Sequence, residues 1–190
     1  MSRKKSFLAA LALVALAAPA LAGTTADITI TVTVEFLSVT VNPTTVALGT
    51  VAAGATTVGT KLDVTNDGNV AQNIGLRILD EDDLNAWTAA AAPGVNIYVL
   101  FGLLVTDGGA APGTGDCGAN DVLTTSVKYW GGDGTAAGSQ LVTDVAAATP
   151  VAASSGRDLY FGFTAPSSVT GPTASQQHAI TVELSVYKKD

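Results

Sequence analysis

Four acidic residues follow one another in the middle of the chain, Asp80-Glu81-Asp82-Asp83. Carboxylates this close repel one another unless water or a cation lies between them. Calcium binds six to eight oxygens, mainly from carboxylates and loop carbonyls, although the run lacks the spacing of an EF-hand loop. Two interpretations remain open, a solvated acidic turn and a calcium site. The candidate calcium ligands are Asp80, Glu81, Asp82, Asp83, Asp107, Asp116 and Asp121.

The residue types that carry out most hydrolytic and transfer reactions are scarce. The chain has a single histidine, His178, and a single cysteine, Cys117. No second cysteine or neighbouring histidine completes a zinc site around Cys117, and no serine has a histidine–aspartate partner pattern around it. Aromatic residues make up only 6% of the chain, too few to suggest the aromatic-lined cleft of a glycosidase. We therefore expect no enzyme, and we expect His178 to be a structural residue at the surface or at a strand edge.

Three aromatic residues allow a binding interpretation. Trp87, Tyr129 and Trp130 would suit a platform on which a sugar ring stacks. Packing in the core or at an interface is the more common use of such side chains. Both interpretations depend on where the strands place these residues.

The most regular stretch of the sequence lies near its beginning. Apolar residues there occupy every second position and polar residues, mostly threonine, lie between them, which is the period of a β-strand with one apolar face. The apolar residues are Ile28, Ile30, Val32, Val34 and Phe36. After Phe36 the apolar residues change from even to odd positions, which predicts two strands in tandem or one strand with a bulge.

The residues before this stretch resemble a secretory signal. Residues 1–22 combine Arg3, Lys4 and Lys5 with an apolar run and end in Ala20-Leu21-Ala22, a cleavage site of the small-x-small type. The apolar run is shorter than the ~20 residues of a membrane span. We expect a secreted or cell-surface protein whose mature chain starts at Gly23 and has no membrane span. Three regions are predicted: a signal peptide (1–22), an N-terminal strand (23–36) and one folded domain (37–190).

Charge limits the partners of the mature chain. Without the three cations of the signal, six Lys and Arg remain against sixteen Asp and Glu, so the net charge is near −10. Such a charge argues against nucleic acid or an anionic membrane as a partner. The lone Cys117 leaves no intrachain disulfide to stabilise the fold.

The rest of the chain alternates short strand patterns with turn signals. We expect a hairpin over residues 60–79 with its turn at Asp67-Gly68-Asn69, and a strand over 95–105 that is buried on both faces at the centre of a sheet. Further strands are predicted at 46–49, 123–130, 140–145, 158–164 and 179–187. No long helix is predicted. The pattern is that of a single antiparallel β-sandwich, Ig-like or jelly-roll, with about eight or nine strands.

Several of these features occur together in one group of proteins. The leader, the threonine- and valine-rich first strand, VTVNPTTVALGTV at 39–51 and VTNDGNV at 64–70 resemble secreted β-sandwich filament subunits of the donor-strand type, such as TasA and archaeal pilins. The likeness to spore-coat U and chaperone–usher pilins is weaker, because the disulfide of the usher pilins is absent. The resemblance covers mainly residues 1–79 and the final strand. It implies a homopolymer in which each N-terminal strand completes the sandwich of the next subunit.

Two functions therefore remain in view. The first is a structural subunit of an extracellular filament, pilus or sheath, with Ile28, Ile30, Val32, Val34 and Phe36 as the donor residues. The alternative is a monomeric, calcium-assisted adhesin or carbohydrate-binding module, in which the first strand pairs within its own sheet. The two differ in the partner of the first strand, which is another copy in one case and the same chain in the other.

Overall fold

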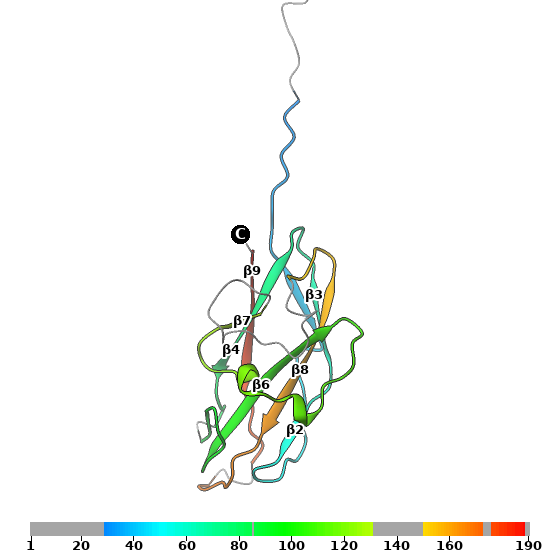
Figure 1. The fold of residues 1–190 in the computed structure, drawn as a ribbon. Coiled ribbons are helices and arrows are strands. Elements are labelled where there is room, and N and C mark those ends of the chain that lie inside the picture. Colours follow the sequence, from blue (N-terminus) through cyan, green and yellow to red (C-terminus); the bar gives the residue numbers. More distant parts are fainter. Residues whose placement is uncertain (1–28, 85, 131–149, 173–175, 189–190) are drawn as a thin grey trace, which may run out of the picture. The chain divides into compact units, whose positions relative to one another are not determined.

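The computed structural model describes residues 29–84, 86–130, 150–172 and 176–188 (Figure 1). The chain divides into two units, residues 1–33 and 34–190, and every strand lies in the second. The strands are β1 (Val39–Asn42), β2 (Thr56–Val58), β3 (Leu62–Asn66), β4 (Gln72–Asp80), β5 (Thr88–Ala89), β6 (Ile97–Thr106), β7 (Lys128–Trp130), β8 (Gly156–Thr164) and β9 (Thr181–Lys188). Two 3-10 helices, η1 (Thr114–Asp116) and η2 (Ala119–Asp121), lie between β6 and β7. No helix in the described ranges is long and apolar enough to cross a membrane.

The strands form two sheets, which confirms the predicted all-β sandwich. The larger sheet has the order β1-β3-β8-β6-β5, with β2 also pairing with β8. The smaller sheet has the order β7-β4-β9. All strand pairs are antiparallel except β5 with β6.

The main core lies between the two sheets and follows the alternation of the strands. On β4, Ile74, Leu76 and Ile78 occupy alternate positions and are each 1% exposed. The larger sheet contributes Leu62 and Val64 from β3, among others, to the same core. Alternate side chains of a strand point to opposite faces, so this spacing directs each apolar set inward.

Strand β6 is buried on both faces, as its continuous apolar sequence predicts. Its even-numbered residues, such as Leu100 and Leu104, join the main core, whereas Leu103 and other odd-numbered residues pack in a second cluster with Val122. The segment that carries η2 therefore covers the outer face of the larger sheet. The predicted place at the centre of the sheet is wrong, because β6 lies between β8 and the two-residue strand β5.

The predicted hairpin over residues 60–79 is also wrong. Both strands are present, but β3 belongs to the larger sheet and β4 to the smaller one. The side chain of Asn66 explains the difference: its Nδ2 donates to the carbonyls of Val70 and Val151, and its Oδ1 accepts from the N–H of Gly68. This buried side chain supports a connection that crosses between the sheets, whereas a hairpin turn would keep both strands in one sheet.

Other predicted strands are partly confirmed. Strands β8 and β9 match the predictions at 158–164 and 179–187, and β7 is the end of the predicted strand 123–130. No strand forms at 46–49, whereas β2 forms at residues 56–58, where no strand is predicted from the sequence. The predicted strand at 140–145 lies outside the described residues.

Candidate functional site

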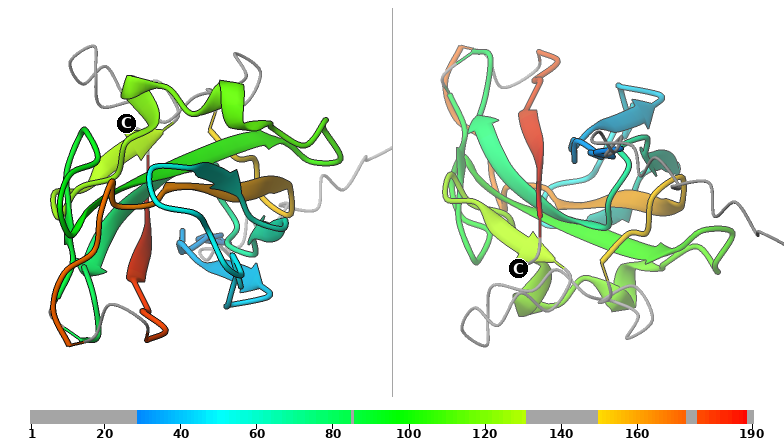
Figure 2. Two further views of the ribbon diagram at one scale, coloured as in Figure 1. Left: turned by 90° about the horizontal axis from the view of Figure 1, so that it is seen from below. Right: turned by 90° about the horizontal axis from the view of Figure 1, so that it is seen from above.

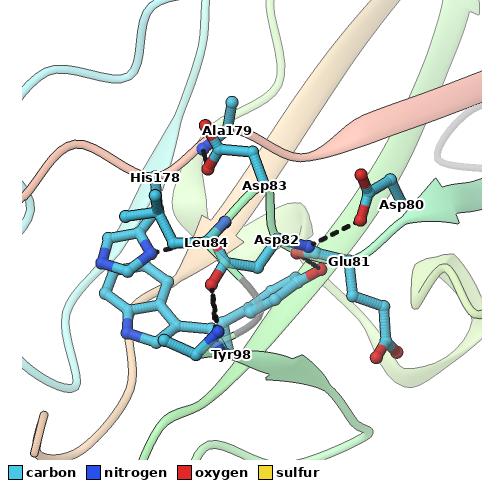
Figure 3. Close-up of polar contacts among 10 residues, drawn as sticks. Asp80, Glu81, Asp82, Asp83, Leu84, Tyr98, His178 and Ala179 are labelled. Atoms are coloured by element: carbon cyan, nitrogen blue, oxygen red, sulfur yellow. Dashed lines mark hydrogen bonds and ion pairs between the residues drawn. The ribbon is translucent and has the colours of Figure 1, made fainter. Parts of the chain in front are cut away.

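The four consecutive carboxylates do not converge on one point (Figure 3). Asp80 Oδ1 accepts from the N–H of Asp82 at 3.3 Å, and Asp83 Oδ1 accepts from the N–H of Ala179 at 2.9 Å. Glu81 Oε1 accepts from the N–H of Ala89 at 3.3 Å. Each carboxylate thus has a backbone donor of its own. The calcium site, which the sequence leaves open beside a solvated acidic turn, stays a prediction.

Asp82 is the centre of a buried polar cluster. Its Oδ2 accepts from the N–H groups of Ala86 at 2.7 Å and Trp87 at 2.9 Å, and its Oδ1 lies 2.8 Å from His178 Nδ1. The side chains of Asp82 and His178 are 1% and 3% exposed. Burial alone would raise the pKa of Asp82, but the bonds from Ala86, His178 and Trp87 outweigh it and lower this pKa below its usual value. Asp82 is therefore a charged structural residue.

The side chain of His178 is buried although the residue as a whole is partly exposed, which corrects the expected surface or strand-edge position of this side chain. Its ring stacks on Trp87 with centroids 3.8 Å apart and an interplanar angle of 12°. Trp87 in turn contacts Tyr98 and Phe163, whose rings lie 6.5 and 6.4 Å away. His178 and Asp82 are 96 positions apart in the chain, and no local sequence pattern signals their contact.

The predicted aromatic platform does not form around Trp87. Trp87 packs against the main core, whereas Tyr129 on β7 meets Tyr187 on β9 edge to face at 4.8 Å. Tyr98 donates its hydroxyl to the carbonyl of Glu81 at 2.7 Å, and burial raises the pKa of this hydroxyl. Trp87 and Tyr98 thus hold the acidic turn against the core, which is the packing interpretation for Trp87.

The remaining acidic candidates stay apart from the acidic run. Asp116 accepts from the N–H of Gly113, and Asp121 accepts from the N–H of Gly118, so that each closes its own 3-10 turn. Asp107 follows β6 and lies near Gly156 at the start of β8. Across the ranges that the structure describes, no three His, Cys, Asp or Glu side chains are placed to hold a metal ion.

Cys117 packs against the second cluster on the outer face of the larger sheet. Burial, with Asp121 and Asp116 nearby, raises the pKa of its thiol, which disfavours the reactive thiolate. A Cβ atom added at Gly162 would lie 2.5 Å from the Cys117 sulfur, so Gly162 is needed for this close approach. The arrangement is a packing contact rather than a nucleophilic centre.

The N-terminal stretch is the main unusual feature of the surface. It contains no strand between residues 29 and 38, although its alternation is the most regular in the sequence. Large apolar side chains are exposed here: Ile30 is 81%, Val32 76%, Val34 75% and Phe36 53% exposed. Ile28, the first predicted donor residue, lies outside the described residues. Exposed apolar rows of this kind mark interaction sites in soluble proteins.

Hydrogen bonds fix the end of this stretch to the sandwich. Asn69 donates from Nδ2 to the carbonyl of Val34 at 2.7 Å and accepts from the N–H of Phe36 at 2.8 Å through Oδ1. Lys188 at the end of β9 forms an ion pair with Glu35 at 2.5 Å. Gln72 exchanges two side-chain hydrogen bonds with the backbone of Ser38. We call this set the N-terminal clamp.

The clamp is not predictable from local sequence. Asn69 is a turn residue by pattern, and Gln72 begins a strand, but their bonding partners lie more than 30 residues earlier. For Gln72, which is fully buried, the sequence signal is its polar type at the start of a buried strand, since buried amide side chains need hydrogen-bond partners. Asn69 is exposed and carries no such signal.

Comparisons with known proteins identify no family for this chain. No model of a known protein family matches the chain, and no curated protein matches its sequence.

Proposed function

We propose that the chain is a structural subunit of an extracellular filament, pilus or sheath, and that it polymerises by inserting its N-terminal strand into the neighbouring subunit. The observation that carries the proposal is the exposed row of Ile30, Val32, Val34 and Phe36 on a stretch that belongs to no strand. A β-prone stretch with one apolar face gains stability by joining a sheet. The signal-like residues 1–22 support export before assembly.

The expected binding energy is sufficient for a stable polymer. Each buried valine, isoleucine or phenylalanine contributes about 1.5–3 kcal/mol, and backbone hydrogen bonds to a neighbouring strand add to this. Ordering of the strand and association cost several kcal/mol. The balance for four or five residues remains favourable. Because donor and acceptor are different surfaces, the contact is head-to-tail and generates an open fibre instead of a closed dimer.

Negative-stain electron microscopy of the mature chain, residues 23–190, tests this proposal. We expect filaments or tubes, and we expect them to form without added calcium, since the acidic side chains already bind backbone donors. Uniform particles of monomer size at high protein concentration would contradict the proposal. They would favour the monomeric binding module as the function.

A further inference from the structure

We propose that the open side of the sandwich between β9 and β1 is the groove that receives the N-terminal strand of a second copy. This inference rests on the proposed function and adds the acceptor site to it. The smaller sheet has only three strands in the described residues, and β9 is its last strand, paired with β4 alone. In both views of Figure 2, β9 and β1 lie on the same side of the sandwich.

The core is incompletely covered along β9. Val182 and Leu184 on β9 pair with Ile78 and Leu76 on β4 and pack against the same core. The β4 residues are 1% exposed, whereas their partners on β9 are only partly buried. Apolar side chains that face the core are therefore fully buried on β4 but only partly buried on the neighbouring strand β9, at the edge of the smaller sheet.

The facing edge of the larger sheet shows the same change. Val41 on β1 pairs with Val64 on β3, which is 1% exposed, yet Val41 itself is only partly buried against the core. The two sheets are joined at one end, where Gln72 at the start of β4 bonds Ser38 immediately before β1. Partly buried apolar side chains that pack against the core thus lie along both edges. They are Val39, Val41, Val182, Leu184 and Val186.

The N-terminal strand of another copy fits this opening in length and pattern. The eight residues of β9 span about 26 Å and the six residues 28–33, which precede the N-terminal clamp, about 20 Å, at about 3.3 Å per residue. The strand has apolar residues at every second position, so that one face would cover the groove and the threonine face would meet water. The strand would add to the edge of β9 that faces away from β4 through backbone hydrogen bonds.

Disulfide trapping between two differently tagged chains tests the groove. Both chains carry Cys117→Ala. The donor chain carries Thr29→Cys, Thr31→Cys or Thr33→Cys on the polar face of the strand, and the acceptor chain carries Ser185→Cys in the middle of β9. A central position is chosen because it serves for a parallel and for an antiparallel insertion. The matched control acceptor carries Thr40→Cys in the middle of β1, on the outer face of the other edge strand.

We expect at least one donor position to cross-link to Ser185→Cys with a yield about tenfold above that of Thr40→Cys, because a disulfide forms only where Cβ atoms come within about 4.5 Å. Electron microscopy of the same mixtures separates the possible failures. Filaments that cross-link at Thr40→Cys, or at neither position, would overturn the β9 groove and leave the proposed function intact. A mixture without filaments would overturn both proposals. A disulfide within one chain that carries Thr31→Cys and Ser185→Cys would also overturn both, since it would show that the strand completes its own subunit.

Discussion

Replacing Ile30, Val32 and Val34 together by aspartate is expected to abolish filaments and to leave the melting temperature of the monomer unchanged. These side chains are at least 75% exposed in the single chain, so their loss removes no core contact. In the filament, each contributes about 1.5–3 kcal/mol of burial, and losing three weakens association by at least about 4 kcal/mol, roughly a thousandfold. Placing charges in an apolar groove adds a further cost. Sedimentation and electron microscopy measure the loss, and thermal unfolding measures the stability.

The matched control for this variant replaces Thr29, Thr31 and Thr33 by aspartate. It adds the same charge to the same stretch but on the opposite face of the strand, because successive side chains alternate. We expect this control to form filaments. Equal loss of filaments in both variants would show that charge repulsion, rather than the apolar face, controls assembly.

Replacing Asp82 by alanine is expected to lower the free energy of unfolding by about 3–5 kcal/mol, the usual effect of removing one partner of a buried, hydrogen-bonded charge. The change leaves the partly buried N–H groups of Ala86 and Trp87 without this acceptor and removes the carboxylate beside His178 Nδ1. Urea unfolding of the monomeric chain measures the effect. The control is Asp83→Ala, which removes an exposed carboxylate with one backbone bond and should cost about 0.5–1.5 kcal/mol.

The contribution of Asp82 to the free energy of unfolding should depend on pH, and comparison of the wild type with Asp82→Ala measures this dependence. The pKa of Asp82 is lowered in the folded protein, so its contribution is complete above the usual carboxyl pKa of about 3.9 and is lost as the pH falls through the lower, folded value. The difference in stability between the wild type and Asp82→Ala should therefore shrink as the pH falls below about 4. A difference that does not shrink below about pH 4 would contradict the charged, structural role of Asp82.

The sequence predicts the fold class because each strand carries its own signal. Alternation identifies β9, and a continuous apolar run identifies β6 as buried on both faces. The pairing of the strands is harder to predict from the sequence. The turn residues Asp67-Gly68-Asn69 suit a hairpin and a connection between sheets equally well. Only the long-range bonds of Asn66 decide between the two.

For the candidate sites too, the sequence predicts some features and the structure alone shows others. The exposed row from Ile30 to Phe36 is visible in the sequence as a strand with one apolar face, whereas its lack of a partner strand is visible only in the structure. The acidic run is also obvious in the sequence. Its function as a cap over Trp87 and His178 depends on contacts between residues far apart in the chain, which composition and spacing cannot supply.

Hydrogen exchange of the backbone amides of residues 29–34 tests the central claim most directly, when the monomer and the assembled protein are compared. If the strand inserts into a neighbour, these amides exchange rapidly in the monomer and at least about a hundredfold more slowly in the filament, because they become part of a sheet. The core strand β6 should be protected in both forms and serves as the internal reference. Rapid exchange of residues 29–34 within filaments, or strong protection already in the monomer, would contradict strand insertion between copies.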